Sequence, residues 1–205
     1  GISRFGKTDT QSLLDFGLIT DKTILAHSNF INPSDIMTIK TAQSAIAHCP
    51  LSNFLFSNAV LPVKQLLDKG VQVGLGTDVS GGAHVSIYDR CVQAIVASRA
   101  LQEGVNASLP PEDRGIANAS INFMEAFWMA TAGGGEALGF KVGIFSEGYC
   151  FDAMIIDTAA TDSNLVLWED MDSAEDILQK IVYNARRPNI RTVWVQGAIV
   201  ANSNK

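Results

Sequence analysis

Compact apolar segments alternate with longer amphipathic segments along most of the chain. Segments 23–27, 44–48 and 71–77 are short apolar runs, typical of strands that are buried on both faces. Helical periodicity or helical end signals mark the segments between and after them. The helices predicted in this way are 10–18, 35–42, 61–69, 86–103, 123–132 and 136–138. Strands that alternate with helices indicate a parallel α/β architecture.

Helix end signals support several of these boundaries. Asn32 followed by Pro33 is a cap followed by proline at the first helical position, and Gly70 stands where a helix would end. Segment 51–59 is polar and contains serine and asparagine, which predicts a loop. Segment 104–120, with Pro110-Pro111, predicts a surface insertion.

The pattern changes near residue 149. Segment 151–157 predicts a strand, and 173–185 predicts a helix. Two further strand runs flank Gln196-Gly197, which predicts a hairpin with a two-residue turn. We therefore expect two units: a barrel-like α/β portion over 1–148 and part of a small β-rich domain over 149–205.

Composition narrows the class of protein. The chain is 47% hydrophobic and 18% charged, with a net charge of −6, which argues against disorder and against a nucleic-acid partner. No apolar run reaches the length of a membrane span. The three cysteines form no paired motif, so we expect a reducing, cytoplasmic location. The start lacks both a methionine and a signal peptide, so we expect a segment of a longer protein.

Three candidate functional residues follow the predicted strands: His27, His48 and Asp78. In a (β/α)8 barrel the active site lies at these carboxyl ends of the strands. Hydrolysis of a C–N bond near neutral pH needs an activated water, which a divalent metal can supply, and a base to move its proton. Asp78 has the chemistry to bind such a metal and hold the proton, and His27 to steer the attacking oxygen.

Structural explanations exist for the same residues. A histidine that ends a buried strand is more often a hydrogen-bonded core residue than a ligand, and this applies to His48 more than to His27. Thr77-Asp78 is also a common helix cap. No HxH, HxxEH or CxxC motif is present, so spacing alone predicts only a parallel α/β protein. The Gly133–Gly135 run lacks a following Lys-Ser/Thr, which favours close helix packing over phosphate binding.

Three longer motifs carry a family resemblance. They are Thr23-Ile-Leu-Ala-His27, Ala47-His-Cys-Pro-Leu-Ser-Asn53 and Gly74-Leu-Gly-Thr-Asp-Val-Ser-Gly-Gly82. In this order they resemble the second half of the metal-dependent amidohydrolase superfamily. The Asp-Val-Ser-Gly-Gly continuation is closest to the guanine deaminase branch. The resemblance covers nearly the whole chain, and segment 104–120 matches least.

The resemblance implies a fold and an activity. The fold would be the C-terminal portion of a (β/α)8 TIM-type hydrolase barrel with part of a small β-rich domain. Asp78 would be a zinc ligand and proton shuttle in contact with the substrate. His27 would be a catalytic residue that contacts the activated water or the substrate, whereas in other branches the matching histidine binds the metal directly. His48 has no implied role. With one zinc per active site, water would attack C2 of guanine and yield xanthine and ammonia. A homodimer is also implied.

The chain departs from the family pattern in what it lacks. The family's first-strand HxH motif, its fifth-strand histidine and the nearby glutamate would all lie before Gly1. The N-terminal half of the same protein is therefore an expected partner. Half a barrel exposes a sheet edge, so we predict that the chain does not persist alone as a soluble monomer. Two alternatives are open: a related aminohydrolase of another purine, pterin or triazine-like heterocycle, or a catalytically silent interaction protein.

Overall fold

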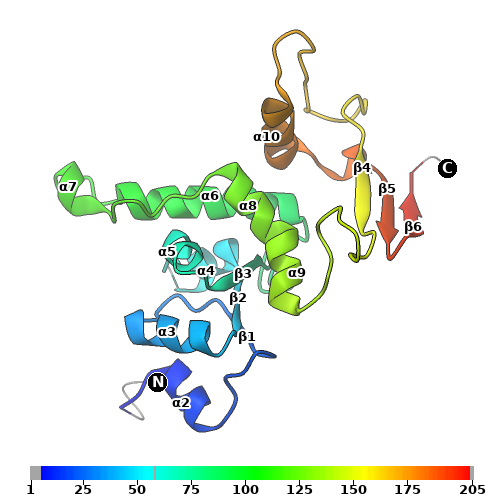
Figure 1. Ribbon diagram of the computed structural model, residues 1–205. Coiled ribbons are helices and arrows are strands. Elements are labelled where there is room, and N and C mark those ends of the chain that lie inside the picture. The colour runs from blue at the N-terminus through cyan, green and yellow to red at the C-terminus, as the bar shows by residue number, and fades with distance from the viewer. Residues whose placement is uncertain (1–5, 58, 204–205) are drawn as a thin grey trace.

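A three-stranded parallel sheet forms the centre of the first part of the molecule. The computed structural model describes residues 6–57 and 59–203. The strands β1 (Ile24–Ala26), β2 (Ala45–His48) and β3 (Gln72–Leu75) lie in the order β1-β2-β3 (Figure 1). Ile46 is in register with Leu25 on one side and with Val73 on the other. The three predicted strands and their parallel arrangement are confirmed, and their carboxyl ends meet at one edge of the sheet.

Helices follow each strand, as the sequence pattern predicts. They are α2 (Asp9–Asp15), α3 (Pro33–Thr41), α4 (Pro50–Ser57), α5 (Val63–Asp68), α6 (Ile87–Glu103), α7 (Pro111–Arg114), α8 (Phe123–Ala130) and α9 (Ala132–Leu138). The predicted start of α3 is confirmed by a capping box. Asn32 accepts a hydrogen bond from the Asp35 amide, and the Asp35 carboxylate accepts one from the Asn32 amide.

The core lies between this sheet and its covering helices. Ile46 and Val73 from the strands pack with Ile39 of α3, Leu66 of α5 and Ile95 of α6, all of which are buried. These are branched aliphatic side chains, and their burial supplies the main stabilisation of this part of the fold. The core therefore fixes β1, β2 and β3 side by side and places their carboxyl-end residues close together.

Two local predictions are wrong. Segment 51–59 contains helix α4, which begins at Pro50, rather than a loop. Its Ser52 and Asn53 are buried rather than exposed, because both side chains turn toward the strand ends. The short helix predicted at 136–138 begins earlier, at Ala132, and contains all three glycines.

The glycines of α9 allow a close contact with the sheet. A Cβ atom placed on Gly74 of β3 would lie 3.1 Å from the Cα atom of Gly134. A side chain at Gly74 would therefore require α9 to shift away from the strand. This contact agrees with the expectation that the glycine run serves close packing.

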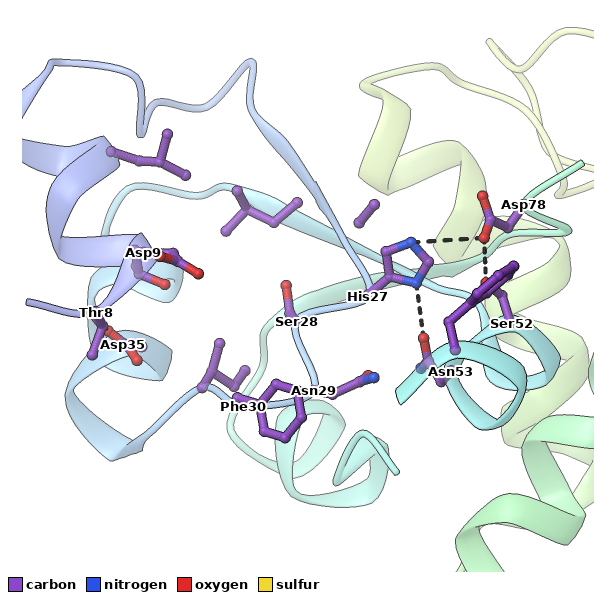
Figure 2. A pocket seen from close by; sticks show the side chains of 16 residues that line it. Thr8, Asp9, His27, Ser28, Asn29, Phe30, Asp35, Ser52, Asn53 and Asp78 are labelled. Atoms are coloured by element: carbon purple, nitrogen blue, oxygen red, sulfur yellow. Dashed lines mark hydrogen bonds and ion pairs between the residues drawn. The ribbon is translucent and has the colours of Figure 1, made fainter. Parts of the chain in front are cut away.

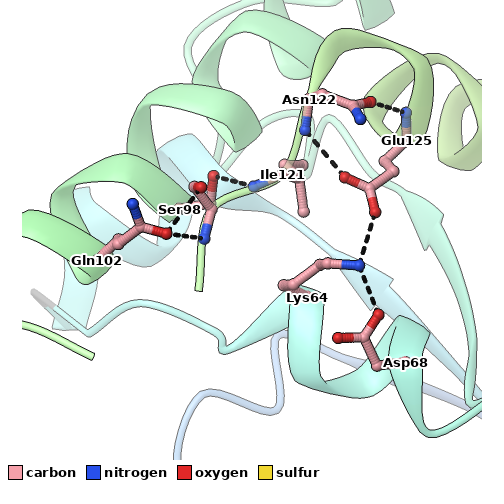
Figure 3. A network of polar contacts seen from close by, with 8 residues as sticks. Lys64, Asp68, Ser98, Gln102, Ile121, Asn122 and Glu125 are labelled. Atoms are coloured by element: carbon pink, nitrogen blue, oxygen red, sulfur yellow. Dashed lines mark hydrogen bonds and ion pairs between the residues drawn. The ribbon is translucent and has the colours of Figure 1, made fainter. Parts of the chain in front are cut away.

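Polar contacts attach the start of α8 to its neighbours (Figure 3). The Ser98 hydroxyl of α6 accepts a hydrogen bond from the Ile121 amide at 3.0 Å. Glu125 closes a capping box with Asn122 and forms an ion pair with Lys64 of α5 at 3.0 Å. These contacts hold α5, α6 and α8 together on the same side of the molecule.

The last part of the described chain forms a second, antiparallel sheet. Its strands β4 (Ala153–Ile156), β5 (Ile190–Val195) and β6 (Ala198–Asn202) lie in sequence order (Figure 1). Gln196 and Gly197 both have positive φ, as a two-residue hairpin turn requires. Helix α10 (Ala174–Asn184) and the 3-10 turn η1 (Arg187–Asn189) connect β4 to β5. Val182 of α10 belongs to the main core, so this helix packs on the first part of the fold.

Both sheets have open edges. Within residues 6–57 and 59–203, β1 and β3 each pair with a strand on one side only, and all five residues of β6 are exposed. Large apolar side chains are also exposed, among them Phe30 and Phe56 near the carboxyl end of the parallel sheet. None of the helices described is both long enough and apolar enough to cross a bilayer.

Candidate functional site

His27 lies directly after β1, where the backbone turns out of the sheet. Its amide still donates to the Ala47 carbonyl at 3.0 Å, as in the parallel ladder. The φ angles of His27 and Ser28 are then 64° and 55°. Positive φ is unusual for residues other than glycine, and residues with such strained backbone angles are common at functional sites. This turn directs the imidazole into the space beyond the strand ends.

Asp78 lies three residues after the end of β3, with a φ of 50°. The loop that follows folds back tightly around it. A Cβ atom on Gly81 would lie 2.9 Å from Asp78 Oδ2, and one on Gly82 would lie 1.9 Å from the Thr77 carbonyl oxygen. The two glycines therefore allow the backbone to enclose the carboxylate, which explains why this loop needs residues without side chains.

The structure brings His27 and Asp78 together. Figure 2 shows the imidazole facing the carboxylate, and His27 Nε2 lies 3.7 Å from Asp78 Oδ2. Both side chains are partly exposed, at 41% and 32%. A base and a hydrogen-bonding group are thus positioned side by side at an accessible surface, as hydrolysis requires.

Helix α4 supplies two further residues that sequence reasoning did not assign. Asn53 Oδ1 lies 2.8 Å from His27 Nδ1, and the Ser52 hydroxyl donates a hydrogen bond to Asp78 Oδ2 (Figure 2). Both residues belong to the Cys-Pro-Leu-Ser-Asn motif, but the loop predicted there did not indicate that their side chains point into the site. Their position shortly after the end of a strand could have identified them.

These residues line one side of an open cavity of about 480 Å³. His27, Ser52, Asn53 and Asp78 lie on that side, and Phe30 also contributes to the lining. The volume suits a small heterocyclic molecule. The mixed lining offers an apolar surface for a ring and polar groups for its edge.

His48 does not line this cavity. Its side chain is 1% exposed, and neither ring nitrogen has a hydrogen-bond partner within the part of the chain that the structure describes. Desolvation, with a smaller contribution from the charge of His27, lowers the pKa of His48 to about 3. His48 is therefore a neutral buried residue. The core-residue explanation fits its burial but not the hydrogen bonds expected for it.

The pKa of His48 leads to a pH-dependent stability. The pKa falls from 6.5 to about 3 on folding, so the unfolded state binds more protons between these values. The stability contributed by neutral His48 is complete above pH 6.5 and is lost as the pH falls through this window, at about 1.4 kcal/mol per pH unit. We expect His48→Gln to flatten the fall in urea midpoint between pH 6.5 and 4, compared with the exposed control His84→Gln. Equal slopes for the two variants would contradict the assignment.

Metal-binding capacity in this chain is partial. Among the residues described, no group of three or more His, Cys, Asp or Glu side chains could hold a metal ion. Asp78 has one oxygen engaged by Ser52, and no hydrogen bond from the described residues engages the other, Oδ1. A carboxylate held in this way suits a zinc ligand, and zinc sites use three or four protein ligands. The residues present therefore fit part of a metal site.

Comparisons with known proteins extend this picture. The amidohydrolase family model matches residues 2–200. The guanine deaminase of Dictyostelium discoideum is 33% identical over 89% of this chain and 38% of its own length. The 5-methylthioadenosine/S-adenosylhomocysteine deaminase of Pyrococcus abyssi is 34% identical, over 96% of this chain and 42% of its own length.

A solved structure agrees with the sequence relatives. The crystal structure of guanine deaminase from C. acetobutylicum, with guanine bound in its active site, has a TM-score of 0.78 and 28% sequence identity. The similarity covers 98% of this chain and 45% of that chain, so this chain spans less than half the length of the relatives it matches. The expected α/β fold, a portion of the amidohydrolase barrel, is confirmed, and so is the resemblance to guanine deaminases. Family, fold and site geometry agree: the chain belongs to the amidohydrolase family.

Proposed function

We propose that this chain is the C-terminal portion of a guanine deaminase, a zinc-dependent enzyme that hydrolyses guanine to xanthine and ammonia. The observation that carries the proposal is the pairing of His27 with Asp78 at the strand ends, Nε2 to Oδ2 at 3.7 Å. Sequence similarity to curated guanine deaminases across 89% of the chain supports the choice of substrate. Amidohydrolases generally use a metal, and Asp78 is the proposed ligand from this chain.

The proposed reaction replaces the 2-amino group of guanine by oxygen from water. A zinc ion bound at Asp78 would supply a water of lowered pKa. Asp78 takes a proton from the attacking water and returns it to the departing amine, so that ammonia leaves. His27 contacts the attacking water and holds its oxygen at C2. The substrate contacts Asp78 during this transfer.

The remaining ligands and the proton donor to the purine ring are proposed to come from an N-terminal portion of the same protein. The open edges of β1 and β3 support this, because a closed barrel needs a strand at each. Helix α4 supports it as well: Ser52 and Asn53 are buried, whereas Leu55 and Phe56 are exposed, at 58% and 75%. Buried polar and exposed apolar side chains on one helix are expected where the exposed apolar surface is covered by another part of the protein.

Other parts of the proposal concern the whole protein. We propose two units, residues 1–148 in the barrel and 149–205 in a small β-rich domain, and a homodimeric assembly. The described cysteines Cys49, Cys91 and Cys150 are all free, which supports a cytoplasmic location.

A second candidate is deamination of another heterocycle. The similarity to the P. abyssi deaminase supports this alternative. A substrate panel on the complete protein separates the two: guanine, 5-methylthioadenosine, a pterin and a triazine, with ammonia measured for each. We expect xanthine and ammonia in equal amounts from guanine and little release from the others. Turnover of another ring without guanine turnover would contradict the proposal, and a protein inert to the whole panel would favour the silent interaction protein.

A further inference from the structure

Two consecutive residues of α4 each engage one of the two proposed catalytic side chains. Ser52 donates to Asp78 Oδ2, and Asn53 contacts His27 Nδ1 at 2.8 Å (Figure 2). Ser52 and Asn53 are 1% and 3% exposed. Helix α4 begins at Pro50, directly after β2 and Cys49, so the middle strand carries both supports. A short helical turn thus bridges the residues that follow β1 and β3.

The contact with Asn53 determines which nitrogen of His27 carries the proton. The atom that faces His27 Nδ1 is the amide oxygen of Asn53, which can only accept a hydrogen bond. Nδ1 must therefore be protonated. When the imidazole is neutral it has a single N–H, and with that proton on Nδ1 the lone pair lies on Nε2. That lone pair is on the nitrogen 3.7 Å from Asp78 Oδ2.

We propose that Asn53 is a positioning residue that fixes His27 in its Nδ1–H tautomer, an inference that rests on the proposed hydrolytic function. In this tautomer His27 Nε2 accepts a hydrogen bond from the attacking water beside Asp78. In the opposite tautomer Nε2 would carry a proton directed at Asp78 Oδ2, and His27 could not accept a hydrogen bond from that water. The hydrogen bond also fixes the ring plane, as partners of catalytic histidines commonly do.

The experiment measures the tautomer directly in the complete protein. ¹⁵N-histidine labelling and NMR distinguish a protonated from an unprotonated ring nitrogen, and His27→Gln identifies the His27 signals by their loss. We expect Nδ1 protonated and Nε2 unprotonated in the wild type. Asn53→Asp keeps an acceptor oxygen and should keep this tautomer. Asn53→Leu removes the acceptor and should shift His27 toward Nε2–H, whereas the exposed control Asn164→Leu should change nothing.

Kinetics give a second readout. Loss of a partner that orients a functional group typically costs about 10- to 100-fold, and we expect Asn53→Leu to lower kcat by this factor with little change in KM, while Asn53→Asp restores part of it. A proton on Nε2 of His27 in the wild-type protein would overturn the inference. This result needs no variant, so it holds even if Asn53→Leu fails to fold. An unchanged tautomer and kcat in a folded Asn53→Leu protein would also overturn it, while leaving guanine turnover intact. A fixed Nδ1–H tautomer in a protein that does not deaminate guanine would instead reject the proposed function alone.

Discussion

Asp78→Asn in the complete protein should abolish most guanine turnover. The amide cannot take and return a proton, and it is a poorer zinc ligand than a carboxylate. We expect kcat/KM to fall by at least about 10³-fold, equivalent to about 4 kcal/mol of transition-state stabilisation. The measurements are initial rates of xanthine formation and the zinc content of the purified variant.

A matched substitution separates this effect from a change in charge. Asp68 is an exposed aspartate at the end of α5, where it pairs with Lys64. Asp68→Asn removes the same charge far from the strand ends and should leave the rate and zinc content within about twofold, because exposed ion pairs contribute little. If Asp78→Asn behaved like Asp68→Asn, Asp78 would have neither proposed role.

Gly82→Ala should impair the site through the backbone. The added Cβ would lie 1.9 Å from the Thr77 carbonyl oxygen, so the loop from Thr77 to Gly82 must move and carry Asp78 with it. A displacement of about 1 Å at a catalytic group can cost about 10²-fold in rate, and we expect a fall of this order in kcat. Circular dichroism should remain close to wild type, since the loop lies outside the core.

The hairpin glycine provides the control for this substitution. Gly197 has a φ of 79°, a Cβ atom added to it would meet no neighbour within 4 Å, and asparagine tolerates positive φ. Gly197→Asn should therefore leave kcat unchanged. Wild-type activity in Gly82→Ala would show that the tight loop around Asp78 is not needed for its function.

The approximate positions of His27 and Asp78 could be predicted from the sequence. Apolar runs predict the three parallel strands, and a parallel sheet places their carboxyl ends at one edge. His27 and Asp78 could therefore be expected near each other. Which atoms of the two side chains face each other could not be predicted. The positive φ angles after β1 and β3 determine this, and the only sequence sign of them is the pair of glycines after Asp78.

The supports from α4 were not predicted, for a physical reason. Serine and asparagine favour turns because their side chains compete for backbone hydrogen bonds. In α4, Ser52 and Asn53 instead bond to Asp78 and His27, contacts that exist only after the strands assemble. The start of α9 was predicted too late, at residue 136, because the low helix propensity of the three glycines is overridden by close packing of Gly134 against Gly74.

The measurement that tests the central claim most directly is zinc stoichiometry, determined with guanine turnover on the 205-residue chain alone and on the complete protein. We predict no stoichiometric zinc and no turnover for the chain alone. For the complete protein we predict about one zinc per active site, with equal release of xanthine and ammonia. Stoichiometric zinc in the chain alone would contradict the claim that it holds only part of the site, and a metal-free, inactive complete protein would contradict the proposed function.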